Sequence, residues 1–256
     1  YYADSARAYI VDPYFVAKFD GFTLKGEFIY GWGKAEFDPG KTALDGNPYK
    51  DLDVDVMTYL FEAGYETGLS GKWHLGYAIE PQAGFQAWRV MPWGACDYFR
   101  PPIVEEGQIV RHEGSYSSDI FTDNALEFLN SQLDTESPFC LHLHFTAPHF
   151  PWEREQHPPE LWDDYYKNCP LTSVPSHEEP VPQGFIPNRR LDEERRRQAL
   201  SGYFTAIQEM DRNVGRVLDW LDENDLRQNT LVAFMSDNGM NMGQHCLYGK
   251  GNATRP

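Results

Sequence analysis

Helical and strand-like apolar patterns alternate along the chain, and this alternation limits its fold more than any other feature. Apolar residues recur at helical spacing in three segments, and a short apolar run typical of a strand follows each: 53–63 then 65–69, 119–133 then 139–145, and 192–221 then 230–235. Strands joined through helices become parallel neighbours in one sheet. The sequence therefore predicts an α/β fold with a mostly parallel central sheet and helices on both faces.

The whole chain, residues 1–256, is expected to form one domain, because 41% of its residues are hydrophobic and supply enough apolar material for a packed core. Residues 1–50 are rich in glycine, which leaves room only for short strands such as 22–30. Residues 151–190 hold many of the 18 prolines and little periodicity, so they are interpreted as a long surface excursion rather than a second core. The chain starts without Met and stops just after a Gly-Lys-Gly turn at 249–251, and we expect the domain to be incomplete at both ends.

The net charge of −17 argues against nucleic acid as a partner, because a phosphate backbone needs a basic surface. An anionic substrate must then be held by a local cluster of cations. The sequence contains no run of 18 apolar residues, so no membrane span is predicted. The four cysteines lack the close pairing of a disulfide scaffold or a CxxC zinc site: Cys96, Cys140, Cys169 and Cys246.

Two segments that follow predicted strands carry candidate cations. The string Gly-Lys-Trp-His-Leu-Gly at 71–76 would turn tightly at its glycines and present Lys72 and His74 on one side, where both could hold one oxyanion. Taken alone, such a pair is more often a solvated surface feature. In 146–151, two prolines flank His149 and would hold its imidazole rigidly. His142 and His144, on the strand before it, are better interpreted as structural or supporting groups.

A candidate metal site follows the apolar run 230–235. Asp237 and Asn238 supply a carboxylate and an amide oxygen, which are hard ligands suited to Ca²⁺ or Mg²⁺ rather than zinc. An Asp-Asn-Gly tripeptide is usually a plain turn, but its place at the end of a strand is where α/β sheets bind their ligands. His245 and Lys250 come soon after it and add an imidazole and an ammonium group.

In the order and spacing of these motifs, the chain resembles the sulfatase family of the alkaline phosphatase superfamily. The resemblance covers roughly residues 50–252, and six strings carry it: Glu-Ala-Gly-Tyr at 62–65, Gly-Lys-Trp-His-Leu-Gly at 71–76, Ala-Pro-His at 147–149, Met-Asp-Arg-Asn-Val-Gly at 210–215, Ser-Asp-Asn-Gly at 236–239, and Gly-Lys-Gly at 249–251. It implies an alkaline-phosphatase-like fold and hydrolysis of a sulfate monoester with a divalent metal, which is Ca²⁺ or alternatively Mg²⁺.

The resemblance also implies a role for each candidate residue. Lys72 and Lys250 would bind sulfate oxygens, His74 would support the catalytic aldehyde hydrate, His149 would protonate the leaving alcohol, Asp237 and Asn238 would coordinate calcium, and His245 would line the pocket. These roles suit the chemistry, because a sulfate ester needs its negative oxygens neutralised and its leaving oxygen protonated. The substrate would be a sulfated small molecule or carbohydrate. The prediction of a carbohydrate is based on the abundant aromatic residues, among them Trp88, Trp93, Tyr98, Trp152 and Trp162.

The nucleophile that the resemblance implies is not found in the sequence. Family members carry a Cys or Ser in a Cys/Ser-x-Pro/Ala-x-Arg motif, which is oxidised to formylglycine. The string 3–7 has Ala3 at the nucleophile's place, and 96–100 has the spacing from Cys96 to Arg100 but Tyr98 in place of Pro or Ala. Two alternatives therefore stay open: a phosphonate or phosphate monoester hydrolase of the same superfamily, and a non-catalytic anion-binding relative.

Overall fold

The computed structural model describes residues 64–174, 191–236, 239–243 and 248–249, together with the backbone of two strands near the N-terminus. The chain divides into two compact units, 1–56 and 57–256, and each is described by itself. In the first unit, β1 (Tyr14–Phe19) and β2 (Phe22–Glu27) pair as an antiparallel hairpin, so a short strand does begin at Phe22 as predicted. The assignment of 1–256 to one domain stays a prediction.

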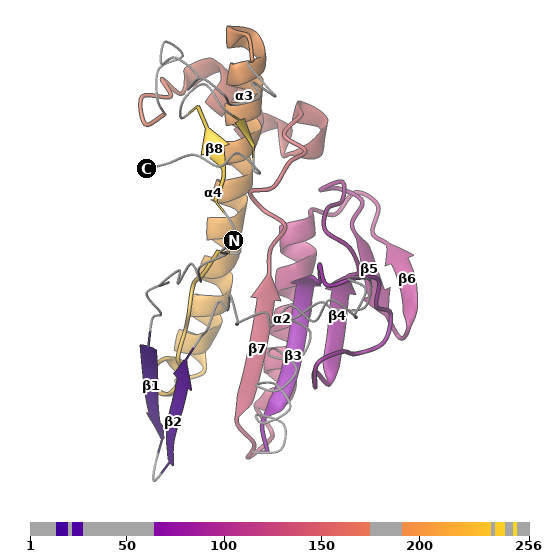
Figure 1. Cartoon of the computed structure of the whole chain (residues 1–256), viewed down its shortest axis with the longest axis vertical. Coiled ribbons are helices and arrows are strands. Elements are labelled where there is room, and N and C mark those ends of the chain that lie inside the picture. Colours follow the sequence, from indigo (N-terminus) through magenta and orange to yellow (C-terminus); the bar gives the residue numbers. More distant parts are fainter. Residues whose placement is uncertain are drawn as a thin grey trace, which may run out of the picture. The chain divides into compact units, whose positions relative to one another are not determined.

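A three-stranded parallel sheet organises the described part of the second unit (Figure 1). Its order is β4 (Ala87–Met91), β3 (Glu66–Lys72) and β7 (Phe139–His144), and β3 runs parallel to both neighbours. The predicted strands at 65–69 and 139–145 are confirmed, and β3 runs three residues beyond its predicted end. The α/β class with a parallel sheet is therefore confirmed.

Helices α2 (Ser117–Gln132) and α4 (Glu193–Glu223) confirm the second and third helical patterns. α2 covers one face of the sheet: the Ser70 hydroxyl of β3 donates to the Phe121 carbonyl at 2.7 Å, and Gly68 leaves room for the Phe128 ring. α4 packs against α2 and starts at Asp192, whose side chain accepts from the Arg195 amide at 2.8 Å. The helix predicted for 53–63 lies outside the described residues.

The other face of the sheet is covered by loop and hairpin residues rather than by a helix in the described part of the chain. Leu69 of β3 and the β4 side chains Trp88 and Val90 pack there against Phe85 of the preceding loop. Val104 joins them from β5 (Pro102–Glu105), which forms an antiparallel hairpin with β6 (Gln108–Arg111). Side chains along β3 thus alternate between the α2 face and this loop-covered face, as the pleat requires.

The described part of residues 151–190 contains more helix than its proline content predicted. It contains η1 (Arg154–Gln156) and α3 (Pro159–Asn168), and α3 packs along α4. Trp152 and Leu171 are buried with Leu200 of α4 in an apolar cluster, so the expectation of a surface excursion without a core is corrected for residues 151–174. Prolines at the first helical turn do not oppose a helix, because their missing N–H groups have no intrahelical acceptor there.

The buried strand predicted for 230–235 is not formed. After η2 (Arg227–Asn229) this run takes no strand pairing, and Leu231, Phe234 and Met235 are 66%, 72% and 69% exposed. A strand needs a neighbour to satisfy its backbone N–H and C=O groups, and none of the described strands lies beside this run. The pair that follows, β8 (Asn241–Met242) with β9 (Tyr248–Gly249), is a short separate ladder. Among the described residues, no helix is both long and apolar enough for a transmembrane span.

Candidate active site

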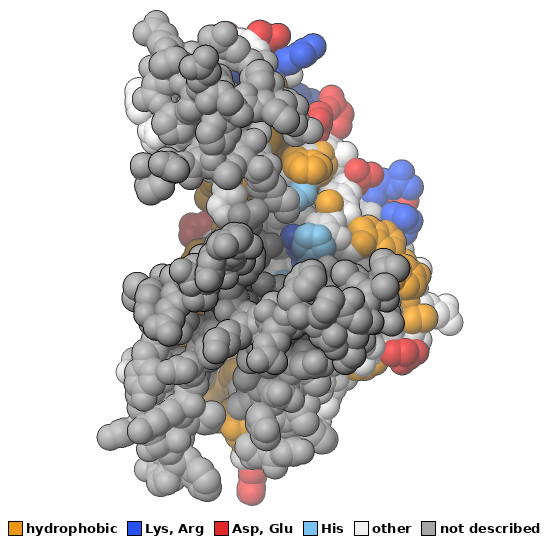
Figure 2. Space-filling model, in the orientation of Figure 1, with side chains coloured by type: hydrophobic (Ala, Val, Ile, Leu, Met, Phe, Trp, Pro, Cys, Tyr) orange, Lys and Arg blue, Asp and Glu red, His pale blue; other side chains and the backbone are white. Residues whose placement is uncertain are grey.

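The carboxyl ends of β3 and β7 bring three of the predicted site residues to one edge of the sheet. Lys72 is the last residue of β3 and His74 lies two residues beyond it, while His149 follows the end of β7 by five residues. The two strands are parallel, so both loops leave the sheet at the same edge (Figure 1). In the space-filling view, histidine side chains lie beside a basic side chain among the described residues (Figure 2).

The remaining predicted site residues lie outside the described residues: Asp237, Asn238, His245 and Lys250. Their place at this edge of the sheet stays a prediction. Ser236 and Gly239, on either side of the Asp-Asn pair, are described, and both follow the unpaired run 230–235. Among the described residues, no group of three or more His, Cys, Asp or Glu side chains is arranged to hold a metal ion.

Close backbone contacts fix the segment that carries Lys72 and His74. Gly71 has φ +107°, and a Cβ there would lie 2.0 Å from the His144 carbonyl oxygen, so only glycine fits. The His144 Nδ1 contacts the Lys72 carbonyl at 3.1 Å, and this nitrogen must donate because a carbonyl can only accept. The His74 ring lies directly against Gly94 in the loop after β4, where a Cβ would come within 2.4 Å of Nε2. Gly71 of the motif therefore permits close contact with the neighbouring strand β7 as well as a turn.

His142 and His144 lie on the loop-covered face of β7. The His142 ring is 5.2 Å from Phe85 and 5.4 Å from His144, centroid to centroid. Burial, and after it the charge of His144, lower the pKa of His142 from 6.5 to about 4, so this imidazole is neutral near pH 7. The contacts agree with the interpretation of both histidines as structural or supporting groups.

The loop from 146 to 151 holds His149 through several hydrogen bonds. The peptide bonds before Pro148 and Pro151 are both cis. The His149 side chain is 8% exposed; its backbone N–H donates to the Thr146 carbonyl at 2.9 Å, and its Nδ1 lies 2.8 Å from the Phe150 carbonyl. Because that acceptor is a carbonyl, Nδ1 carries the proton, which leaves Nε2 as the ring nitrogen suited to exchange a proton with a substrate.

Cys96, whose spacing to Arg100 resembles the nucleophile motif, lies in an apolar environment. It packs against the cluster formed by Met91 and Ile103. Burial, and then the charge of Asp97, raise the pKa of its thiol to about 12, so almost no thiolate is present at neutral pH. Cys96 is therefore a structural residue rather than a nucleophile.

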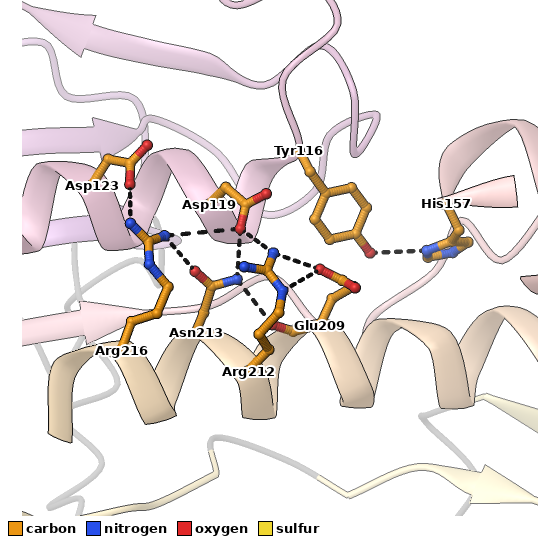
Figure 3. A network of polar contacts seen from close by, with 8 residues as sticks. All are labelled: Tyr116, Asp119, Asp123, His157, Glu209, Arg212, Asn213 and Arg216. Carbon is orange, nitrogen blue, oxygen red and sulfur yellow. Dashed lines mark hydrogen bonds and ion pairs between the residues drawn. The ribbon is translucent and has the colours of Figure 1, made fainter. Parts of the chain in front are cut away.

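A separate hollow of about 620 Å³ lies beside the first turns of α2. Its lining includes Phe99, His112 and Tyr116 together with the carboxylates Asp119 and Asp123. Both carboxylates already pair with arginines of α4 (Figure 3). Their charges stabilise the helix packing, and the hollow adds no residue to the candidate site.

Comparison with known proteins decides the family. The family model named Sulfatase matches residues 39–256. The chain belongs to the sulfatase family. This agrees with the strings at 71–76, 147–149 and 236–239, which the match covers.

Relatives with sulfatase names match over most of this chain. It is similar to an N-acetylglucosamine-6-O-sulfatase of Bacteroides thetaiotaomicron, 26% identical over 255 residues, with 75% of this chain and 45% of that protein covered. It is 30% identical over 243 residues to an uncharacterised sulfatase of Schizosaccharomyces pombe, with 78% and 43% covered. The chain thus spans less than half the length of these relatives.

Solved sulfatase structures share the fold. The structure of a putative sulfatase from Bacteroides fragilis superposes with a TM-score of 0.58 at 25% identity, over 75% of this chain and 44% of that one. A structure solved with its substrate D-glucosamine-2-N,6-O-disulfate superposes with a TM-score of 0.54 at 23% identity, over 75% of this chain and 51% of that one. The alkaline-phosphatase-like fold expected from the sequence is thereby confirmed.

Sequence reasoning missed the residues that surround the sulfatase motifs. The Tyr98 hydroxyl donates to the His149 carbonyl at 2.7 Å, and the Trp152 indole donates to the Pro148 carbonyl at 2.9 Å. The sequence places both aromatic residues among the candidate carbohydrate contacts, yet Tyr98 is fully buried and Trp152 is 9% exposed. A tyrosine or tryptophan is often buried when its polar atom finds a backbone acceptor, and nothing in the sequence identifies that acceptor.

Proposed function

We propose that the protein containing this chain is a sulfuric ester hydrolase that acts on sulfate monoesters with a divalent metal. The observation that carries the proposal is that Lys72, His74 and the rigidly held His149 all follow strands that end at one edge of a parallel sheet. Membership of the sulfatase family supports it. Transfer of a sulfuryl group needs positive charge near the sulfate oxygens and a proton for the leaving oxygen, and these residue types supply both.

Each residue would have a separate task. Lys72 and Lys250 would pair with the sulfate oxygens, and His245 would line the pocket. His149 would take up a second proton from solvent on Nε2 and donate it to the leaving oxygen, while Nδ1 keeps its own proton on the Phe150 carbonyl. His74 would support the attacking hydrate of formylglycine, the nucleophile expected in the family, although its motif is not found in this sequence.

The proposed metal is Ca²⁺, with Mg²⁺ as the alternative. Asp237 and Asn238 would supply two hard oxygen ligands, whose chemistry fits either ion. Calcium takes six to eight oxygens, so these two residues alone would hold it weakly. A bound ion would neutralise charge on the sulfate group.

The proposed substrate is a sulfated carbohydrate or small molecule. Of the aromatic residues first considered, Trp88, Tyr98, Trp152 and Trp162 are buried, so they offer no surface to a sugar. Trp93 lies next to Gly94, which contacts His74, and its ring stacks with Tyr77, which is 67% exposed. An exposed tyrosine stacked on a half-buried tryptophan suits the apolar face of a sugar, and the name of the Bacteroides thetaiotaomicron relative refers to a sulfated sugar.

Turnover assays test the proposal against its rivals. The full reading frame that contains this chain is assayed with a chromogenic aryl sulfate and with the matching phosphate and phosphonate esters. We expect the sulfate ester to be preferred, and Lys72→Ala or His149→Ala to lower kcat/KM by about 100-fold or more. Lys167→Ala, which removes an exposed lysine of α3 that pairs with Asp163 at 3.1 Å, is the control and should leave the rate unchanged.

The same assays define what would overturn the proposal. Preference for the phosphate or phosphonate ester would identify the other hydrolase of the superfamily. Binding of sulfate without turnover of any ester by the full reading frame would identify a non-catalytic relative. The 256-residue chain alone is expected to bind sulfate without turnover, and rapid turnover by it would reveal a nucleophile that the sequence did not identify.

A further inference from the structure

Three successive backbone carbonyls of the His149 loop each accept a hydrogen bond from a different aromatic ring. The His149 carbonyl accepts from the Tyr98 hydroxyl at 2.7 Å, and the Phe150 carbonyl accepts from the His149 Nδ1 at 2.8 Å. The Pro151 carbonyl contacts the His157 Nε2 at 3.0 Å. The carbonyl that orients the His149 ring therefore lies between two carbonyls that are held from outside the loop.

The contacts of His157 fix its protonation. Its side chain is fully buried, and burial lowers its pKa to about 4 against the opposing hydrogen bond to Pro151. The ring is therefore neutral near pH 7. Its Nε2 must donate, because the Pro151 carbonyl can only accept, so its Nδ1 accepts the proton of the Tyr116 hydroxyl 2.9 Å away (Figure 3).

Tyr98, Tyr116 and His157 form one packed group, here called the aromatic clamp. The Tyr98 ring stacks on Tyr116 with centroids 5.1 Å apart and planes 20° apart, and it lies 4.7 Å from the His157 ring. The clamp is joined to α2, since the Ser117 amide donates to the Tyr98 carbonyl at 2.7 Å. All three side chains are less than 5% exposed, so a change in their hydrogen bonds would leave a buried polar group unsatisfied.

We propose that Tyr98 and His157 are positioning residues that set the orientation and tautomer of His149. By holding the carbonyls of residues 149 and 151, they fix the Phe150 carbonyl at the place where it accepts the Nδ1 proton of His149. Nε2 is then the ring nitrogen that would take up a proton and pass it to the leaving oxygen. This inference rests on the role proposed above for His149, whereas the tautomer itself is a property of the protein without substrate.

The first test measures the tautomer directly. Nitrogen NMR of ¹⁵N-histidine-labelled protein, with the His149 signal assigned by its loss in His149→Gln, should show a proton on Nδ1 in the unchanged protein. Tyr98→Phe removes only the hydroxyl, and we expect its His149 nitrogen shifts to move toward the average of the two tautomers. Tyr165→Phe is the matched control, because it removes a hydroxyl that donates to Gln208 at 2.8 Å between α3 and α4.

The second test measures turnover of an aryl sulfate by the full reading frame. Tyr98→Phe and His157→Leu should lower kcat by about 10-fold or more with KM changed less than about 2-fold, because a displaced proton donor slows chemistry rather than binding. His157→Gln keeps an N–H donor near the Nε2 position and should recover most of the rate. Tyr165→Phe should leave kcat unchanged.

The outcomes separate this inference from the proposed function. An unchanged His149 tautomer and an unchanged kcat in Tyr98→Phe would overturn the inference, even if His157→Leu fails to fold. A shifted tautomer in Tyr98→Phe, combined with a rate that does not depend on His149, would support the positioning role of the aromatic clamp. It would at the same time refute the role of His149 as proton donor. Loss of kcat with an unchanged tautomer would also overturn the inference, because it would show that Tyr98 acts by another route.

Discussion

At the scale of single residues, glycines decide how closely the segments of the candidate site approach one another. Gly71 lies in the motif at 71–76, and the sequence predicted a turn there but not its contact with the His144 carbonyl. Gly94 was not singled out at all, although the His74 ring packs against it. A sequence pattern shows that a glycine is present, but the atom that requires it lies on a neighbouring strand or loop, and that neighbour is known only from the fold.

Gly94→Ala is expected to impair function more than stability. The added Cβ would come within 2.4 Å of the His74 Nε2, so the ring must move, but the ring is the end of an exposed side chain and can do so at small cost. We expect kcat/KM of the full reading frame to fall by about 10-fold or more while the free energy of unfolding changes by less than about 1 kcal/mol.

Gly71→Ala is the contrasting substitution. Its Cβ would overlap the His144 backbone at a φ of +107°, so the expected loss is about 3 kcal/mol or more in the free energy of unfolding. Urea unfolding of both variants provides the measurement. Equal losses of stability in the two variants would contradict the contact described at Gly94.

At the scale of elements, sequence patterns predicted the long helices well and the strands less well, because a helix depends only on its own residues. α2 and α4 were predicted within two residues because a helix bonds within itself, and its apolar face repeats in the sequence. The run 230–235 was wrongly predicted as a buried strand, because a strand is completed by a neighbour that no pattern within it reveals. α3 was missed because it has only 10 residues and one fully packed side chain, Trp162, too few for a periodic signal.

Two glycines on α4 should respond to alanine in opposite directions. Gly202 lies against the Trp152 backbone, where a Cβ would be 2.1 Å from the carbonyl oxygen, while Gly215 has open space around it. Gly202→Ala should therefore destabilise the protein by about 2–4 kcal/mol despite the better helix propensity of alanine. Gly215→Ala should stabilise it by about 0.5–1 kcal/mol. The free energies of unfolding in urea test both, and stabilisation by Gly202→Ala would refute the close approach of α4 to the loop after β7.

The polar contacts between α2 and α4 should also differ in how much they contribute to the free energy of unfolding. Asn213 is fully buried; its amide donates to Asp119 at 2.8 Å and to the Glu209 carbonyl at 2.9 Å (Figure 3). Asn213→Leu should cost about 2–3 kcal/mol, because it removes the hydrogen bonds of a fully buried amide that joins the two helices. Arg216→Ala, which removes a partly exposed ion pair with Asp123, should cost about 1 kcal/mol or less. Thermal unfolding that ranks the two variants in the reverse order would contradict this account.

At the scale of the whole molecule, the sequence predicted that three candidate residues share one edge of the sheet, but not which contacts hold them there. Lys72, His74 and His149 follow strands that proved parallel, so their common edge follows from the order of elements. The aromatic clamp could not be predicted, since its members come from three loops and neither their spacing nor their types form a motif. Asp237, Asn238, His245 and Lys250 stay predictions from the motifs.

Acid stability is a property of the whole molecule to which buried histidines contribute. The folded protein lowers the pKa of His157 and of His142 from 6.5 to about 4, in both cases mainly by burial. Between these values the unfolded chain binds protons that the folded protein does not, so the free energy of unfolding falls as pH falls from about 6.5 to 4. Above pH 6.5 this contribution is fully present. Each histidine accounts for at most about 3 kcal/mol of the decline.

The decline in the free energy of unfolding can be assigned to His157 because carboxylates take up protons only at lower pH. Arg154, and then Lys167, hold the pKa of Asp163 at about 2, below its usual 3.8, so the stabilisation from that cluster is lost only below pH 3.8. His157→Gln keeps a donor for the Pro151 carbonyl but cannot take up a proton. We therefore expect urea unfolding at pH 7, 5.5 and 4.5 to show a decline in stability about half as steep in His157→Gln as in the unchanged protein. The same steepness in both proteins would mean that His157 is already protonated in the folded state at pH 4.5, and the tautomer on which the aromatic clamp depends would then be wrong.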